Sequence, residues 1–136
     1  MKLSVVQDLR QEIADEETKL ESFRKYEPLI SLALAYLPPT LKTQGDIAQF
    51  FAQIEESERR LETLRDECTA ATVQLADEIY RRVHGATCYV LIQRYCHGKR
   101  FGKIASELSY SATNIYRLHR QGVRAYNAVD DLQRPI

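Results

Sequence analysis

The chain has 136 residues, of which 44% are hydrophobic and 28% are charged, and its 19 basic residues balance its 19 acidic ones. This composition argues against a disordered chain, and the length allows one ordinary core or two small helical modules. The three cysteines form no CxxC pair and leave one over, which argues against a disulfide framework and favours a reducing, cytoplasmic setting.

No secretory or membrane-spanning segment is expected. The N-terminal stretch turns acidic at once and has no apolar core of a signal peptide. The most apolar run, residues 29–37, is nine residues long, whereas a spanning helix needs about 20. We therefore expect a soluble protein with no membrane partner.

The neutral total hides an uneven distribution of charge. Residues 1–79 hold 9 Lys and Arg against 16 Asp and Glu, a net charge of −7, and residues 80–136 hold 10 against 3, a net charge of +7. Such asymmetry indicates a basic module that meets a polyanion, joined to an acidic module with another role.

The first predicted element is one helix over residues 3–25. Its apolar residues occupy the a and d positions of a heptad frame: Val6, Leu9, Ile13, Leu20 and Phe23. Glu16 is the single interruption. We expect the helix to end before Pro28, because the residue before a proline is pushed out of the α region. Residues 29–37 are then predicted to form a short buried helix that Pro38 and Pro39 close.

A longer pattern begins at Asp46. Apolar residues recur every seven positions, with a second set at the d positions: Ile47, Ile54, Leu61, Cys68 and Leu75, then Phe50, Leu64 and Ala71. Ser57 is the exception among the d positions. Heptads kept in register predict coiled-coil packing. Two interpretations fit equally well: an antiparallel hairpin with residues 3–25, or a dimerisation element.

A break follows at His84-Gly85, since glycine is the usual residue just past a helix end. Residues 86–96 are apolar nearly all round, as in a central buried helix, and residues 97–99 then make a turn. Two histidines and two cysteines of this region could be drawn as a zinc site: His84, Cys88, Cys96 and His97. Their spacing does not match that of structural zinc sites, so we expect no metal and no cofactor. The chain is predicted to be all-α.

Residues 101–120 have the spacing of a helix-turn-helix. A small residue, Ala105, stands where the two helices must approach closely, and apolar residues fill the inward positions: Ile104, Leu108, Ile115 and Leu118. Ser109 stands in the turn where glycine is usual, at a position that needs a positive φ. Ser111 is a good N-cap for the second helix.

The second helix has two faces at about 100° per residue. Ile115, Leu118, Gly122 and Tyr126 share the apolar face. We expect the following residues to contact DNA: Thr113, Arg117, Arg120 and Arg124 on the opposite face, Tyr116, Asn114 and Gln121 on its flanks, Ser111 at the helix start, and Lys99 and Arg100 before the first helix. Such a basic face suits the major groove, where arginine pairs with guanine or grips phosphate.

The segment RYCHGKRFGKIASELSYSATNIYRLHRQGVRAY, residues 94–126, resembles the helix-turn-helix of σ-factor region 4. It is more similar to phage and prophage transcriptional regulators of the ArpU/RinA kind, in which a pattern RY-x-x-G-K-x-(aromatic)-x-x-I-A follows a helical N-terminal region. The resemblance covers about residues 86–127, although Gly102 and Lys103 replace a usual acidic pair. It implies double-stranded DNA as the partner, transcription of phage or mobile-element late genes as the process, and a bacterial host cell as the setting.

We therefore divide the chain into an acidic helical region, residues 1–83, for oligomerisation or partner binding, and a basic DNA-binding domain, residues 84–136. The first function to consider is a DNA-binding transcription regulator that acts as a homodimer or larger oligomer, with RNA polymerase as a candidate partner. The alternatives are a DNA-packaging protein like a small terminase subunit, or a phage protein that binds a host regulator. No catalytic motif is present, so an enzyme is not expected.

Overall fold

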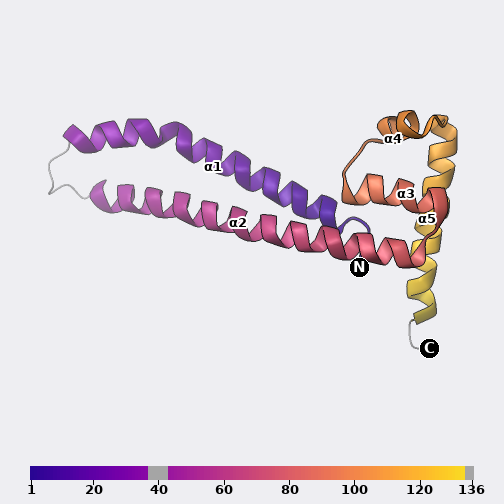
Figure 1. Ribbon diagram of the computed structural model, residues 1–136. Helices are drawn as coiled ribbons and strands as arrows, with labels where there is room; N and C mark the ends of the chain where they lie inside the picture. The colour runs from indigo at the N-terminus through magenta and orange to yellow at the C-terminus, as the bar shows by residue number, and fades with distance from the viewer. Residues whose placement is uncertain (37–42, 134–136) are drawn as a thin grey trace. The chain divides into compact units, whose positions relative to one another are not determined.

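The computed structural model describes residues 1–36 and 43–133, and throughout this part of the chain the ordered elements are helices, with no strand (Figure 1). The elements in chain order are α1 (Val5–Tyr36), α2 (Thr43–Arg82), α3 (Gly85–Leu91), the π-helical segment η1 (Ile92–Cys96), α4 (Phe101–Leu108) and α5 (Ala112–Gln133). The predicted all-α fold, with long helices first and a short helix-turn-helix last, is confirmed.

Contacts within the chain divide it into two compact units. Residues 9–67 form one unit, and residues 1–8 together with the chain from Cys68 onwards form the other. The last part of α2 therefore belongs to the same unit as α3, α4 and α5. The division of roles between residues 1–83 and 84–136 stays a prediction.

The unit of residues 9–67 is an antiparallel hairpin, in which α1 and α2 lie side by side (Figure 1). Its core contains residues of both apolar patterns: Leu20, Ile54 and Leu61, with Ile13, Phe23, Phe50 and Phe51 packed against them. The rings of Phe23 and Phe50 meet edge to face, 5.8 Å apart. The heptad seam thus joins two helices of one chain, as the hairpin interpretation predicts.

Two expectations about the end of α1 are wrong. The helix does not end before Pro28 but continues to Tyr36 with the proline inside it. Pro28 is exposed, so the carbonyl four residues earlier, which loses its amide partner, can bond to water. The expected buried helix at 29–37 is also not found, since Leu29, Leu32 and Tyr36 are 63%, 59% and 82% exposed. The proline pair that was expected to close it lies outside the described residues.

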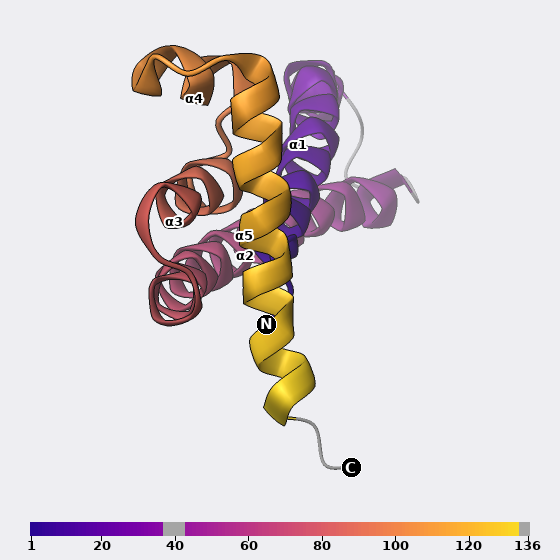
Figure 2. The same ribbon diagram turned by 90° about the vertical axis from the view of Figure 1, so that its right-hand side faces the viewer.

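The second unit has α5 as its central element, with α3 and α4 on one side of it (Figure 2). Its buried residues include Val6 of α1, Cys96 of η1 and the following: Leu75, Ile79, Val83, Cys88, Val90, Leu91, Ile104, Ala105, Ile115, Leu118 and Tyr126. Gly122 lets α5 approach α3, because a Cβ atom there would lie 3.0 Å from Cγ of Leu91. The phenol of Tyr126 donates a hydrogen bond of 2.9 Å to Glu78 of α2.

The predicted break between the long helices and the C-terminal helices is confirmed. Helix α2 ends at Arg82, and Gly85 has a φ of 69°, a value that glycine adopts freely. The turn predicted at residues 97–99 is also present, with Gly98 at a φ of 68°. Within residues 1–36 and 43–133, no helix combines the length and the apolar character that crossing a bilayer requires.

Candidate nucleic-acid interface

Helices α4 and α5 pack against each other as the two helices of a helix-turn-helix. Ala105 is buried at their contact, in one cluster with Ile104, Ile115 and Leu118. Ser109 ends α4 in the left-handed conformation, with φ 57° and ψ 37°. This conformation reverses the chain, and the next amide, that of Tyr110, donates a hydrogen bond to the carbonyl of Ala105 at 2.9 Å. The positive φ expected in this turn is confirmed.

Helix α5 begins as predicted, with Ser111 as its cap. The hydroxyl of Ser111 accepts a hydrogen bond from the amide of Asn114 at 3.2 Å. This bond satisfies one of the amides that have no partner inside the first turn of a helix. Ser111, Ala112 and Thr113 are exposed, so the start of α5 is open to a ligand.

The two faces of α5 differ in burial as the angular prediction requires. The buried residues are Ile115, Leu118, Gly122 and Tyr126. The exposed residues are Thr113, Tyr116, Arg117, Arg120, Gln121 and Arg124, with Asn114 half-buried between the faces. We call Thr113, Arg117, Arg120 and Arg124 the basic face. From residue 108 to residue 129 the sequence has no acidic residue, so no carboxylate of this helix stretch neutralises that face.

One arginine of the basic face is held in place. The side-chain oxygen of Asn114 accepts two hydrogen bonds from Arg117, one from Nη2 at 2.6 Å and one from Nε at 3.3 Å. Arg120 and Arg124, by contrast, have no hydrogen-bond or ion-pair partner among the described residues. The three arginines therefore differ in how far their guanidinium groups are fixed before any ligand arrives.

The residues before α4 are less uniform than predicted. Lys99 is engaged, since its ammonium lies 3.0 Å from both carboxylate oxygens of Glu107. Arg100, by contrast, is exposed at the N-cap of α4. Lys103, which is exposed in the first turn of α4, was not among the predicted contacts. Its position in the helix that precedes the turn could have suggested it, because that helix crosses the DNA backbone in proteins of this architecture.

Aromatic rings of α4 and η1 pack against α5. The ring of Phe101 lies 5.1 Å from that of Tyr116 and 4.9 Å from that of His119, and the guanidinium of Arg94 stacks over Phe101 at 4.5 Å. The Tyr95 hydroxyl and Nε2 of His119 are 2.6 Å apart in a hydrogen bond. Burial, and then the nearby charge of Arg94, lower the pKa of His119. His119 is thus half-buried against the rings of Tyr95 and Phe101.

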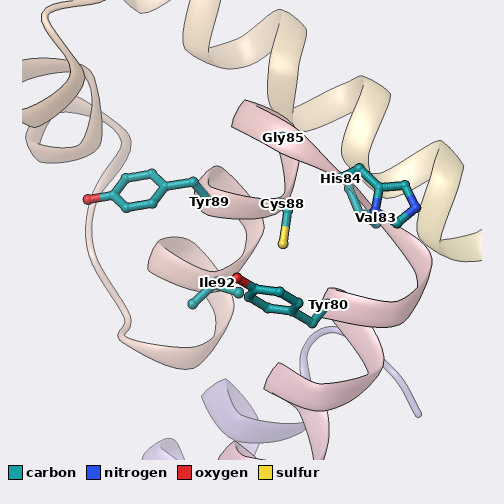
Figure 3. Close-up of a pocket in the computed structure, with 7 residues that line it drawn as sticks. All are labelled: Tyr80, Val83, His84, Gly85, Cys88, Tyr89 and Ile92. Atoms are coloured by element: carbon teal, nitrogen blue, oxygen red, sulfur yellow. The ribbon is translucent and has the colours of Figure 1, made fainter.

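One cavity of this unit lies away from the basic face. This cavity of about 370 Å³ is lined by residues of α2, α3 and η1 (Figure 3): Tyr80, Val83, His84, Gly85, Cys88, Tyr89 and Ile92. Figure 3 shows the sulfur of Cys88 pointing into it, while the ring of His84 does not point toward that sulfur. Burial raises the pKa of the Cys88 thiol, which disfavours the thiolate that a metal needs.

The zinc arrangement weighed from the sequence does not assemble in the described residues. Within this part of the chain, no three His, Cys, Asp or Glu side chains gather closely enough to hold a metal ion. The candidate site is the exposed basic face of α5.

Comparison with protein-family models, with curated proteins and with solved structures finds no match to this chain. The resemblance of residues 94–126 to phage regulators therefore stays a prediction. The function has to be argued from the geometry of α4 and α5.

Proposed function

We propose that this protein binds double-stranded DNA in a sequence-specific manner and regulates transcription, with genes of a phage or mobile element as its targets. The observation that carries the proposal is the two-sided character of α5. Its buried face anchors the helix to Ala105 and Ile104 of α4, and its exposed face presents three arginines and a threonine. A helix of this kind fits the major groove, where the second helix of a helix-turn-helix contacts base edges.

Charge supports the same proposal. The residues from 80 onwards carry a net charge of +7 although the whole chain is neutral. A clustered basic face is the electrostatic footprint of a nucleic-acid-binding domain. The acidic hairpin would be repelled by DNA, which suits a role in contacting another protein. RNA polymerase is the partner that the resemblance to σ-factor region 4 suggests.

We also propose that the protein acts as a homodimer. The a and d residues of the hairpin pack within one chain, so they do not form the contact between two copies. An apolar stripe on α1 remains exposed and is formed by Tyr26, Leu29, Leu32 and Tyr36. From Pro28 to Tyr36 the sequence carries no charge, so two copies can bring these stripes together without burying an ion. Two copies would place two helix-turn-helix units on two half-sites.

The DNA-binding proposal is tested by measuring the affinity of the full chain for duplex DNA. The double variant Arg117→Ala/Arg120→Ala should bind duplex DNA at least 10-fold more weakly, since each arginine contributes about 1–3 kcal/mol if it reads bases. The matched control is Arg24→Ala/Arg59→Ala, which removes two exposed arginines from the hairpin and should leave affinity nearly unchanged. Equal affinity of wild type and the α5 variant would refute DNA binding by this helix.

A further inference from the structure

We propose that Arg117 reads a guanine in the major groove and that Asn114 is the positioning residue that orients its guanidinium. This inference rests on the proposed function and deepens it by naming the residue that sets specificity and the base that it selects. It is carried by the pair of hydrogen bonds between these two side chains, which Arg120 and Arg124 lack.

The two bonds occupy one edge of the guanidinium. Asn114 accepts from Nη2 and from Nε of Arg117, and these two nitrogens form the side edge of the planar group. The outer edge, with one N–H of Nη1 and the second N–H of Nη2, carries no partner among the described residues. Two parallel donors on an exposed side chain are thereby fixed in direction.

Guanine is the base whose major-groove edge matches this pair of donors. It presents two acceptors, O6 and N7, whereas adenine offers one acceptor beside a donor, thymine one acceptor and cytosine a donor. A guanidinium whose outer edge is free can bond both acceptors at once. The residue lies close to the start of α5, which is the part of a recognition helix that contacts base edges.

The other two arginines suit phosphate. Arg120 and Arg124 lie further along the same exposed face, and neither is bonded to another side chain among the described residues. A phosphate can be reached from many directions, so an arginine that is not held in one orientation can bind it. A base contact requires one orientation, and the bonds to Asn114 hold Arg117 near such an orientation before DNA binds, which lowers the entropy lost on binding.

The test starts from duplexes selected by the full-length wild-type chain out of a random-sequence library. Each guanine of the selected site is then replaced in turn by 7-deazaguanine, which lacks the N7 acceptor. At one guanine the wild-type affinity should fall roughly 5- to 150-fold. Arg117→Ala should bind the normal and the substituted duplex equally. Arg117→Lys, whose ammonium can still donate to N7 but has no planar pair of donors for Asn114 to orient, should keep only part of the discrimination. The matched control Arg120→Ala should keep it.

Asn114 is tested by the same ratio, that of the affinity for the normal duplex to the affinity for the duplex with 7-deazaguanine. Asn114→Ala should lower the discrimination at that guanine by roughly 2- to 10-fold, the cost of ordering one long side chain. Asn114→Asp, which retains an acceptor for Arg117, should restore the ratio although its charge lowers affinity for all duplexes. A merely structural role would change the melting temperature and leave the ratio untouched.

The outcomes separate this inference from the proposed function. A wild-type chain that binds no duplex overturns both. A wild type that binds duplexes but enriches no sequence overturns the guanine reading and leaves only non-specific DNA binding. A wild type that selects a site whose guanine ratios are unchanged in Arg117→Ala overturns the inference alone. So does a loss of discrimination that is equal in Arg117→Ala and Arg120→Ala.

Discussion

Ser57 donates a hydrogen bond of 2.7 Å from its hydroxyl to the carboxylate of Glu16, across the seam of the α1–α2 hairpin. Both side chains are buried, at 2% and 8% exposure, and each is the one interruption in the apolar pattern of its helix. The second carboxylate oxygen of Glu16 lies 3.4 Å from Nε of Arg60. Because the two polar groups meet in only one register, the pair favours this alignment of the helices over a shifted one.

The first prediction concerns this pair. Ser57→Ala should lower the free energy of unfolding by about 1–3 kcal/mol, because a buried carboxylate oxygen loses its partner. Glu16→Leu/Ser57→Ala should recover most of that loss, since both polar groups are then replaced by apolar ones. Urea unfolding followed by circular dichroism gives the coupling. Ser22→Ala, at an exposed serine of α1, is the control and should change little. Strictly additive effects of the two substitutions would contradict the pairing.

The pair also illustrates what could be predicted from the sequence. Ala105, Ser109 and Ser111 were assigned correctly because a helix-turn-helix is specified by local spacing. Glu16 and Ser57 are 41 residues apart, so the sequence shows each as an interruption of an apolar pattern and does not show that they are partners. The bonds between Asn114 and Arg117 were not foreseen, although residues three apart on a helix are neighbours and could have suggested them.

The errors near the end of α1 have a different origin. The preference of the residue before Pro28 is local and modest. Whether a helix continues through a proline depends on water and packing around it, which sequence periodicity does not report. Leu29 and Leu32 were predicted to be buried because they are apolar, but apolar residues also occur on surfaces, and an exposed apolar stripe marks an interaction site.

The second prediction contrasts two glycines. Gly122→Ala should destabilise the protein by about 1 kcal/mol or more. Its Cβ would lie 3.0–3.2 Å from three atoms of the fully buried Leu91. The destabilisation from overpacking should exceed the stabilisation from the higher helix propensity of alanine. Gly102→Ala, in the exposed first turn of α4 with no atom within 4 Å of the new Cβ, should stabilise by up to about 1 kcal/mol. Thermal melts of both variants decide the matter, and a shift of the same sign in both would contradict the close approach.

The third prediction concerns the turn. Ser109 holds a left-handed conformation that costs a residue with a side chain about 1 kcal/mol. Ser109→Gly should therefore raise the free energy of unfolding by about that amount. Ser109→Val should lower it below that of wild type, because a β-branched side chain tolerates this region least. The same urea titration measures both variants. A destabilising glycine would mean that the turn has another conformation in solution.

The fourth prediction concerns pH. Burial lowers the pKa of His119 in the folded protein, so the unfolded chain takes up a proton first as the pH falls below the ordinary value of about 6.5. Stability from this group is therefore complete above that value and is lost as the pH falls toward the lower folded pKa. The melting temperature of wild type should drop between about pH 7.5 and about pH 5.5 by more than that of His119→Gln, which cannot titrate. Equal drops in the two proteins would contradict the shift.

The last prediction concerns association. In one chain Leu29 and Leu32 are exposed, whereas Ile54 and Leu61 are buried in the hairpin core. Leu29→Glu/Leu32→Glu should therefore keep the helicity of wild type but convert the dimer to a monomer, because charges would enter the proposed apolar contact between two copies. It should also weaken binding to a two-half-site duplex, since each chain then binds alone.

Ile54→Asp/Leu61→Asp should instead reduce the helicity, because unpaired charges in the core should unfold the hairpin. Val73→Glu, at an exposed apolar residue of α2 that is not part of the stripe, should change neither mass nor helicity and is the control. Light scattering and circular dichroism on the same samples separate the cases. If the Leu29→Glu/Leu32→Glu variant has the mass of a wild-type dimer, the stripe is not the dimer contact. If the wild type instead assembles into about eight or more chains, the result supports DNA packaging, which requires a ring.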